Sequence, residues 1–130
     1  MLSVALMWVG VAAAQLPTAT LSGEISGITR NLVNDTVYIL NGFVYVEDNA
    51  TLNIEPGTII RGDKDTKGTL IVTRGSQIFA NGTVDQPIVF TSNQAEGSRT
   101  YGDWGGLIIL ECSCQNCPSI QGALTSLTTS

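Results

Sequence analysis

The chain has 130 residues and a net charge of −5, and 13% of its residues are charged, about half the share of an ordinary soluble domain. This length gives one domain with room for a core. Histidine is absent, which excludes a Ser-His-Asp or Cys-His nucleophile and any His-ligated metal in this chain. The six Lys and Arg residues form no basic stripe, so we expect no nucleic-acid partner.

The N-terminus has the pattern of a secretory leader. Residues 2–11 are apolar, and Ala12, Ala13 and Ala14 supply the small side chains that a signal peptidase requires. We interpret residues 1–14 as a signal peptide, too short to span a bilayer; a hydrophobic first strand of the fold is the alternative. The mature protein would be secreted or attached to the cell surface, without a transmembrane span.

Residues 15–35 are rich in Thr, Ser, Gly and Asn and show weak periodicity. We expect a linker and an N-terminal cap there, with one capping strand at about residues 24–28. From Thr36 onward apolar and polar residues alternate, as half-buried strands require. Asn41-Gly42 and Glu55-Pro56-Gly57-Thr58 predict turns, the second of type II because Pro presets the first central φ and Gly accepts the positive second one.

The central part of the chain, residues 43–92, contains the same strand–turn–strand pattern twice. Corresponding apolar positions lie 26 residues apart, and 30 apart beyond the last turn. Self-similarity at such a period indicates stacked units that bury their apolar faces on each other. The corresponding pairs are Val44 and Leu70, Val46 and Val72, Leu52 and Ile78, Ile54 and Ala80, and Ile60 and Phe90.

We therefore predict an all-β fold, a right-handed parallel β-helix (a solenoid) of about three to four coils over residues 36–110. Equivalent side chains of successive coils would stack about 4.8 Å apart. A β-sandwich is the alternative, and it requires antiparallel pairing across Asn41-Gly42. The residues predicted to point inward are Val46, Leu52, Ile54, Val72, Ile78, Ile88 and Phe90.

Residues 111–130 have no period-two apolar pattern, and we expect an irregular tail. The strand at residues 107–110 would then end the helix with an unpaired edge, which favours self-association. Cys112, Cys114 and Cys117 lie in this tail. They fit one disulfide with a leftover thiol, or a soft-metal site that lacks a fourth ligand.

Two groups of residues are candidate binding sites. Asp63 and Asp65 could offer oxygen ligands to calcium, although their spacing is not that of an EF-hand, and a solvated loop is the alternative. Tyr45, Tyr101 and Trp104 could form an aromatic surface for a carbohydrate; alternatively, Trp104 covers the end of the core. No residue is predicted to be catalytic, and calcium is the one cofactor considered.

Three asparagines match the N-glycosylation pattern Asn-x-Ser/Thr: Asn34, Asn49 and Asn81. Two of them lie at predicted strand corners, where Asn is favoured for its backbone conformation. The pattern therefore leaves both a glycan and a plain turn residue open at these positions.

Several ordered sequence blocks resemble a family of secreted bacterial right-handed parallel β-helix proteins, related in fold to pectate lyases. The blocks begin with Ala-Thr-Leu-Asn-Ile-Glu-Pro-Gly-Thr-Ile-Ile at residues 50–60 and end with Gly-Asp-Trp-Gly-Gly at residues 102–106. The resemblance spans about residues 36–110 and implies an exported surface protein. It stops after Leu110, where further coils would be implied, so we expect a truncated end.

These observations favour a non-catalytic extracellular β-helix module with a structural or adhesive role, a fragment of a larger exported protein. A fragment of a polysaccharide-lyase-like enzyme and a module that binds carbohydrate or calcium are the alternatives. The expected partners are a surface polysaccharide or another cell-surface protein.

Overall fold

The computed structural model of the protein describes residues 15–110 and 127–129, which form ten strands and no helix. The part of the chain so described therefore has no helix that could cross a membrane. The strands are β1 (Thr18–Ser26), β2 (Thr29–Leu32), β3 (Val37–Glu47), β4 (Thr51–Ile54), β5 (Ile59–Gly62), β6 (Thr69–Val72), β7 (Gln77–Ala80), β8 (Ile88–Ser92), β9 (Gly106–Ile109) and β10 (Leu127–Thr129).

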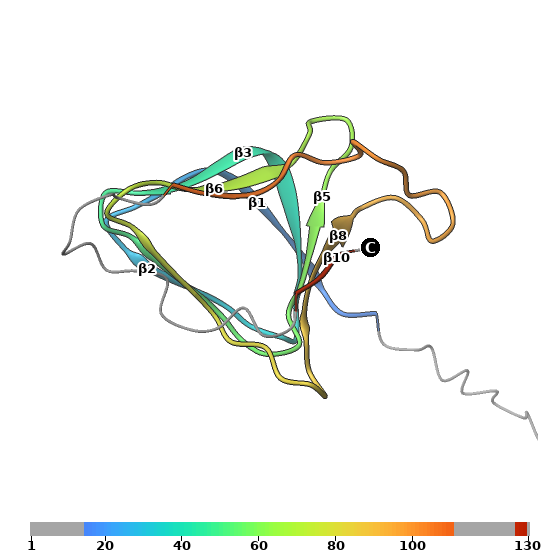
Figure 1. Cartoon of the computed structure of the whole chain (residues 1–130), viewed down its shortest axis with the longest axis horizontal. Coiled ribbons are helices and arrows are strands. Elements are labelled where there is room, and N and C mark those ends of the chain that lie inside the picture. The colour runs from blue at the N-terminus through green and yellow to red at the C-terminus, as the bar shows by residue number, and fades with distance from the viewer. Residues whose placement is uncertain (1–14, 111–126, 130) are drawn as a thin grey trace, which may run out of the picture.

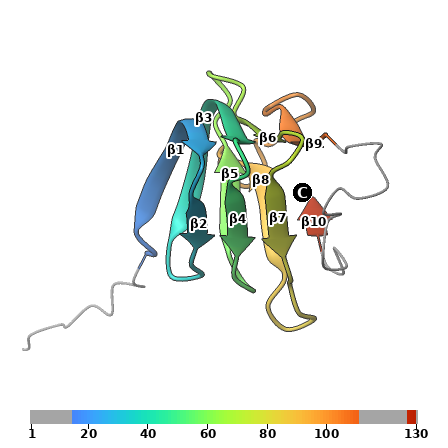
Figure 2. The ribbon, with the colours of Figure 1, turned by 90° about the vertical axis from the view of Figure 1, so that its left-hand side faces the viewer.

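The strands wind around a triangular cross-section with three faces (Figure 1). The first face contains the N-terminal halves of β1 and β3, followed by β5, β8 and β10. The second face contains the C-terminal halves of β1 and β3, followed by β6 and β9. The third face contains β2, β4 and β7. Every pairing among these strands is parallel, and successive coils lie side by side in Figure 2, which confirms the parallel β-helix.

The β-sandwich alternative is wrong at Asn41-Gly42, where no hairpin forms. β3 runs through both residues and bends there from the first face to the second, with Gly42 at φ 69°. On one side of the bend β3 pairs with β5, and on the other with β6. Glycine, which has no Cβ, takes this left-handed conformation at no steric cost. Asn41-Gly42 therefore forms a corner within one strand and not a turn between two strands.

The register between coils follows the repeat read from the sequence. Leu52 pairs with Ile78, Val44 with Leu70, and Ile60 with Phe90. Because strand side chains alternate between the two faces of a sheet, parallel pairing in this register stacks like residues on one another inside the coil. All seven residues predicted to point inward are buried.

The winding begins earlier than we expected. β1 and β2 lie within residues 15–35, for which we had expected a linker and a capping strand, and they form the first coil beside β3 and β4. Leu21, Ile25 and Leu32 are buried in the same core cluster as the later coils. Among the described strands, β1 pairs with β3 and β2 pairs with β4, each on one side, which accords with the weak apolar pattern of this segment.

The winding also resumes after residue 110, contrary to the irregular tail that we expected. Leu127–Thr129 forms β10, which pairs in parallel with Ile88, Val89 and Phe90 of β8. Backbone groups alone can make such a pairing, so an edge strand needs little apolar pattern. Cys112, Cys114 and Cys117 lie outside the described residues.

The predicted turn at residues 55–58 is present. Thr58 N donates to Glu55 O over 3.2 Å, and Gly57 has a φ of 83°. At the corner between β3 and β4, Asp48 and Asn49 both have positive φ, at 52° and 61°. Asn and Asp tolerate this conformation better than other residues with a Cβ, so these corners let the chain change face within two residues.

Candidate functional site

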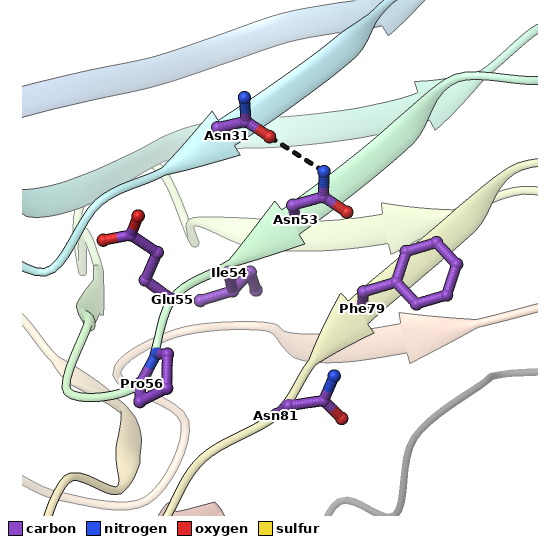
Figure 3. Close-up of a pocket in the computed structure, with 7 residues that line it drawn as sticks. All are labelled: Asn31, Asn53, Ile54, Glu55, Pro56, Phe79 and Asn81. Atoms are coloured by element: carbon purple, nitrogen blue, oxygen red, sulfur yellow. Dashed lines mark hydrogen bonds between the residues drawn. The ribbon is translucent and has the colours of Figure 1, made fainter.

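A groove of about 490 Å³ lies on the outer surface of the third face (Figure 3). Its floor is made by residues that alternate with the core residues of β2, β4 and β7. Asn31, Asn53 and Phe79 occupy the same register position on these three strands. Pairing in parallel therefore brings together three side chains that are 22 and 26 residues apart in the sequence. The residues that line the groove are Asn31, Asn53, Ile54, Glu55, Pro56, Phe79 and Asn81.

The two asparagines of the floor are joined side chain to side chain. Asn53 Nδ2 donates to Asn31 Oδ1 over 2.8 Å, as the dashed line in Figure 3 shows. Each amide has two donor hydrogens and an acceptor oxygen. Asn31 Nδ2 and Asn53 Oδ1 have no other partner among the described residues. The pair thus offers one donor group, on Asn31, and one acceptor, on Asn53.

Glu55 and Asn81 lie where β4 and β7 end, toward one end of the groove (Figure 3). Glu55 Oε2 accepts a hydrogen bond from Asn34 N, and Asn34 Nδ2 donates to Pro56 O. These two bonds connect successive coils at the corner after the third face. They hold the corner that borders the groove.

The side chains that line the groove are mostly amides and apolar groups. Its lining has three amides, one aromatic ring and one carboxylate, and no hydroxyl, thiol or amine that could act as a nucleophile. Amides and aromatic rings recognise neutral ligands that carry hydroxyl groups, because they offer hydrogen bonds and an apolar face together. The lining carries one acidic residue, Glu55.

A second cluster surrounds Asp103, in the loop between β8 and β9. Its side chain is buried and accepts hydrogen bonds from Ser92 Oγ, Thr100 N and Thr100 Oγ1, each 2.9 Å long. Lys64 Nζ lies 3.3 Å from Asp103 Oδ1. The bond from the Thr100 backbone is the main cause that lowers the pKa of the Asp103 carboxyl well below its usual range; burial opposes this, and the side chains of Thr100, Ser92 and Lys64 add to it. With all of these partners, Asp103 anchors its own loop.

The candidate calcium residues Asp63 and Asp65 lie in the loop between β5 and β6. Asp63 Oδ2 accepts hydrogen bonds from Thr66 N and Thr66 Oγ1, over 3.2 and 2.8 Å, while Asp65 is exposed. Across residues 15–110, no three side chains of the Asp, Glu, Cys or His type lie together as metal ligands would. The Asp63 carboxylate instead orders the loop between β5 and β6.

The three candidate aromatic residues have different surroundings. Tyr45 contacts the ring of Phe43, with centroids 6.3 Å apart. Trp104 stacks on the buried ring of Phe90 at 6.4 Å and 6°, and Tyr101 is fully exposed. Trp104 lies against Gly62, where any Cβ would collide with its side chain. The structure thus places Trp104 over the core, the alternative we had considered.

The groove was not predicted from the sequence because the polar residues that line it are of no conspicuous type. One signal could have revealed it. The offset of 26 that aligns Leu52 with Ile78 also aligns Asn53 with Phe79 on the opposite side of the same strands.

A model of the family "pectate-lyase like beta helix domain" matches residues 23–128 of the chain. No curated protein and no solved structure matches the chain. The matched range covers β2 to β9, together with residues 23–26 of β1 and residues 127–128 of β10.

Proposed function

Because the chain belongs to the family of pectate-lyase-like β-helix domains, we propose that it is a non-catalytic extracellular module that adheres through the groove of its third face. The observation that carries the proposal is the pair Asn31–Asn53, which offers a donor and an acceptor beside Phe79. A neutral polysaccharide segment supplies the complementary hydroxyl groups and an apolar ring face.

Rigid strands support this role. Asn53 and Phe79 each lie between two buried side chains of their strand, and Asn31 precedes the buried Leu32. A site on such strands changes little when a ligand binds, and this lowers the entropy lost on binding. Adhesion through a preformed groove therefore suits the β-helix.

Export is part of the proposal. The apolar residues 2–11 and the small residues at 12–14 resemble a signal peptide, and β1 begins at Thr18, after the proposed cleavage point. Cleavage after Ala14 would leave every described strand in place. Expression of the chain with its leader in a secreting bacterium, followed by N-terminal sequencing of the exported protein, should give Gln15 as the first residue. Retention of Met1 would contradict export by this leader.

Binding is tested by calorimetry with neutral and acidic oligosaccharides of equal length. We expect the neutral ones to bind, and Phe79→Ala and Asn53→Ala each to weaken binding several-fold. Tyr101→Ala is the matched control, since Tyr101 is exposed outside the groove. Equal loss in the Tyr101 variant would refute the assignment to the groove, and cleavage of the oligosaccharide would refute the non-catalytic role.

A further inference from the structure

Asn81, at the rim of the groove, is followed by Gly82, and Asn41-Gly42 is the other Asn-Gly step of the chain. At such a step the glycine nitrogen can attack Cγ of the asparagine, because no Cβ on the glycine hinders it. A bond forms between the glycine N and the asparagine Cγ, and Nδ2 leaves as ammonia with the proton of the glycine N–H. Water then opens the cyclic imide to aspartate or isoaspartate.

The structure holds Asn41-Gly42 in a form that opposes this attack. Gly42 N donates a hydrogen bond to Thr66 Oγ1 over 2.9 Å, and Thr66 Oγ1 in turn donates to Asp63 Oδ2. Both residues also lie inside β3, where residues 37–40 before them and residues 44–46 after them pair in parallel with strands on both sides. The attacking nitrogen is therefore engaged and its backbone is held, although Asn41 itself is exposed.

Within residues 15–110, Asn81-Gly82 has none of these restraints. β7 ends at Ala80, and Asn81 is exposed beyond it. The next backbone bond joins Thr83 N to Gln86 O over 3.1 Å and leaves Asn81 and Gly82 outside it. Among the described residues, the Gly82 nitrogen has no hydrogen-bond partner.

We propose that Asn81 is a site of spontaneous deamidation, and that Thr66 protects Asn41 from the same reaction. The product would place a second carboxylate in the groove, on the same rim as Glu55 (Figure 3). If the groove binds neutral ligands, which rests on the function proposed above, the added charge and the altered backbone weaken that binding.

The test uses the full chain, made in a bacterial cytoplasm so that no glycan occupies Asn81, and incubated at mildly alkaline pH. Peptide mapping by mass spectrometry follows the gain of about 1 Da that marks each deamidation. In the folded protein we expect conversion at Asn81 to be several-fold faster than at Asn41, and in urea the two rates should be similar. Equal rates in the folded protein, or a faster rate at Asn41, would overturn the proposal.

Two sets of variants separate the parts of the proposal. Gly82→Ala should strongly slow conversion at Asn81; Gly82 does not have the positive φ that would strain an alanine. Thr66→Val should raise the rate at Asn41 several-fold, whereas Thr66→Ser, which keeps the hydroxyl, should not. An unchanged Asn41 rate in a folded Thr66→Val protein would refute the protective role.

These rates are measured without any ligand, so they hold or fail independently of the proposed function. Binding of a neutral oligosaccharide is then compared between the native and the isoaspartate-81 protein. A several-fold weaker binding of the modified form supports the link to the groove, and equal binding refutes it.

Discussion

The Lys64 ammonium lies 3.3 Å from the carboxylate of Asp103, which is 1% exposed. Lys64 follows β5 and Asp103 precedes β9, so the ion pair connects loops of two successive coils. Lys67 of the same loop donates to Gly102 O. These contacts position the loop between β8 and β9, and with it Trp104 over Phe90.

Replacing Asp103 by Ala should lower the thermal midpoint of unfolding more than replacing Lys64 by Met. Asp103→Ala leaves the Thr100 amide and two hydroxyl groups without their acceptor, and buried donors without acceptors are costly. The Lys64 side chain is 44% exposed. Water therefore replaces much of the interaction that is lost when the ion pair with Asp103 is removed. Circular dichroism melts compare the two with Asp65→Asn, an exposed control in the same loop. A larger effect from Lys64→Met would contradict this ranking.

Acid should remove the contribution of Asp103. The folded protein holds the pKa of this carboxyl below its ordinary value of 3.8, so the unfolded chain takes up a proton first as the pH falls. The stabilisation is fully present above 3.8 and is lost progressively below it. Urea titrations at a series of pH values should show the difference between the wild type and Asp103→Asn constant near neutrality and shrinking in acid. A difference that grew in acid would contradict this prediction.

Glu47 should behave in the opposite way. Burial raises the pKa of its carboxyl above the ordinary 4.5, and the charges of Glu24 and Asp48 raise it further. The folded protein then binds this proton more tightly than the unfolded chain, so ionisation at higher pH costs stability. Glu47→Gln should therefore raise the thermal midpoint at pH 7 but not at pH 3. A lower midpoint at pH 7 would show that the ionised carboxylate is stabilising.

Leu52 and Asn53 are neighbours on β4 with opposite roles. Leu52 is fully buried, and Leu→Ala at such a site costs about 2–5 kcal/mol of unfolding free energy. Asn53 points outward, and its removal should cost about 1 kcal/mol for the hydrogen bond to Asn31. Urea denaturation of Leu52→Ala and Asn53→Ala measures both. Equal losses would contradict the assigned faces of β4.

Deleting β10 should favour self-association. Its pairing covers the outer edge of β8, and a chain that ends at residue 126 exposes those backbone groups for pairing with another molecule. Sedimentation velocity at micromolar concentration should show more dimer or larger species for the shortened chain than for the full one. Identical distributions would mean that β10 does not protect this edge.

The fold was largely predictable from residues 43–92. A coil that repeats puts each side chain in the same surroundings as its equivalent, so Leu52 and Ile78 are both aliphatic and the repeat is visible in the sequence. The first coil was not predictable in this way, because β1 and β2, which each pair on one side among the described strands, carry a weaker apolar pattern. β10 was not predictable either. Its pairing with β8 uses backbone groups that every residue has, so the pairing leaves no pattern of side chains in the sequence.

The candidate sites depended much more on tertiary structure. From the sequence, Asp63, Asp65 and the aromatic residues stood out by type, yet Asp63 binds Thr66 and Trp104 covers Phe90. Asp103 did not stand out, because burial of a charge depends on donors brought to it by other loops. The apolar repeat by itself determined which residues face the core and which coils pair, since burial of aliphatic side chains requires nothing more specific. Only the tertiary structure decided what the polar residues do, because each hydrogen bond needs a partner at a particular distance and direction.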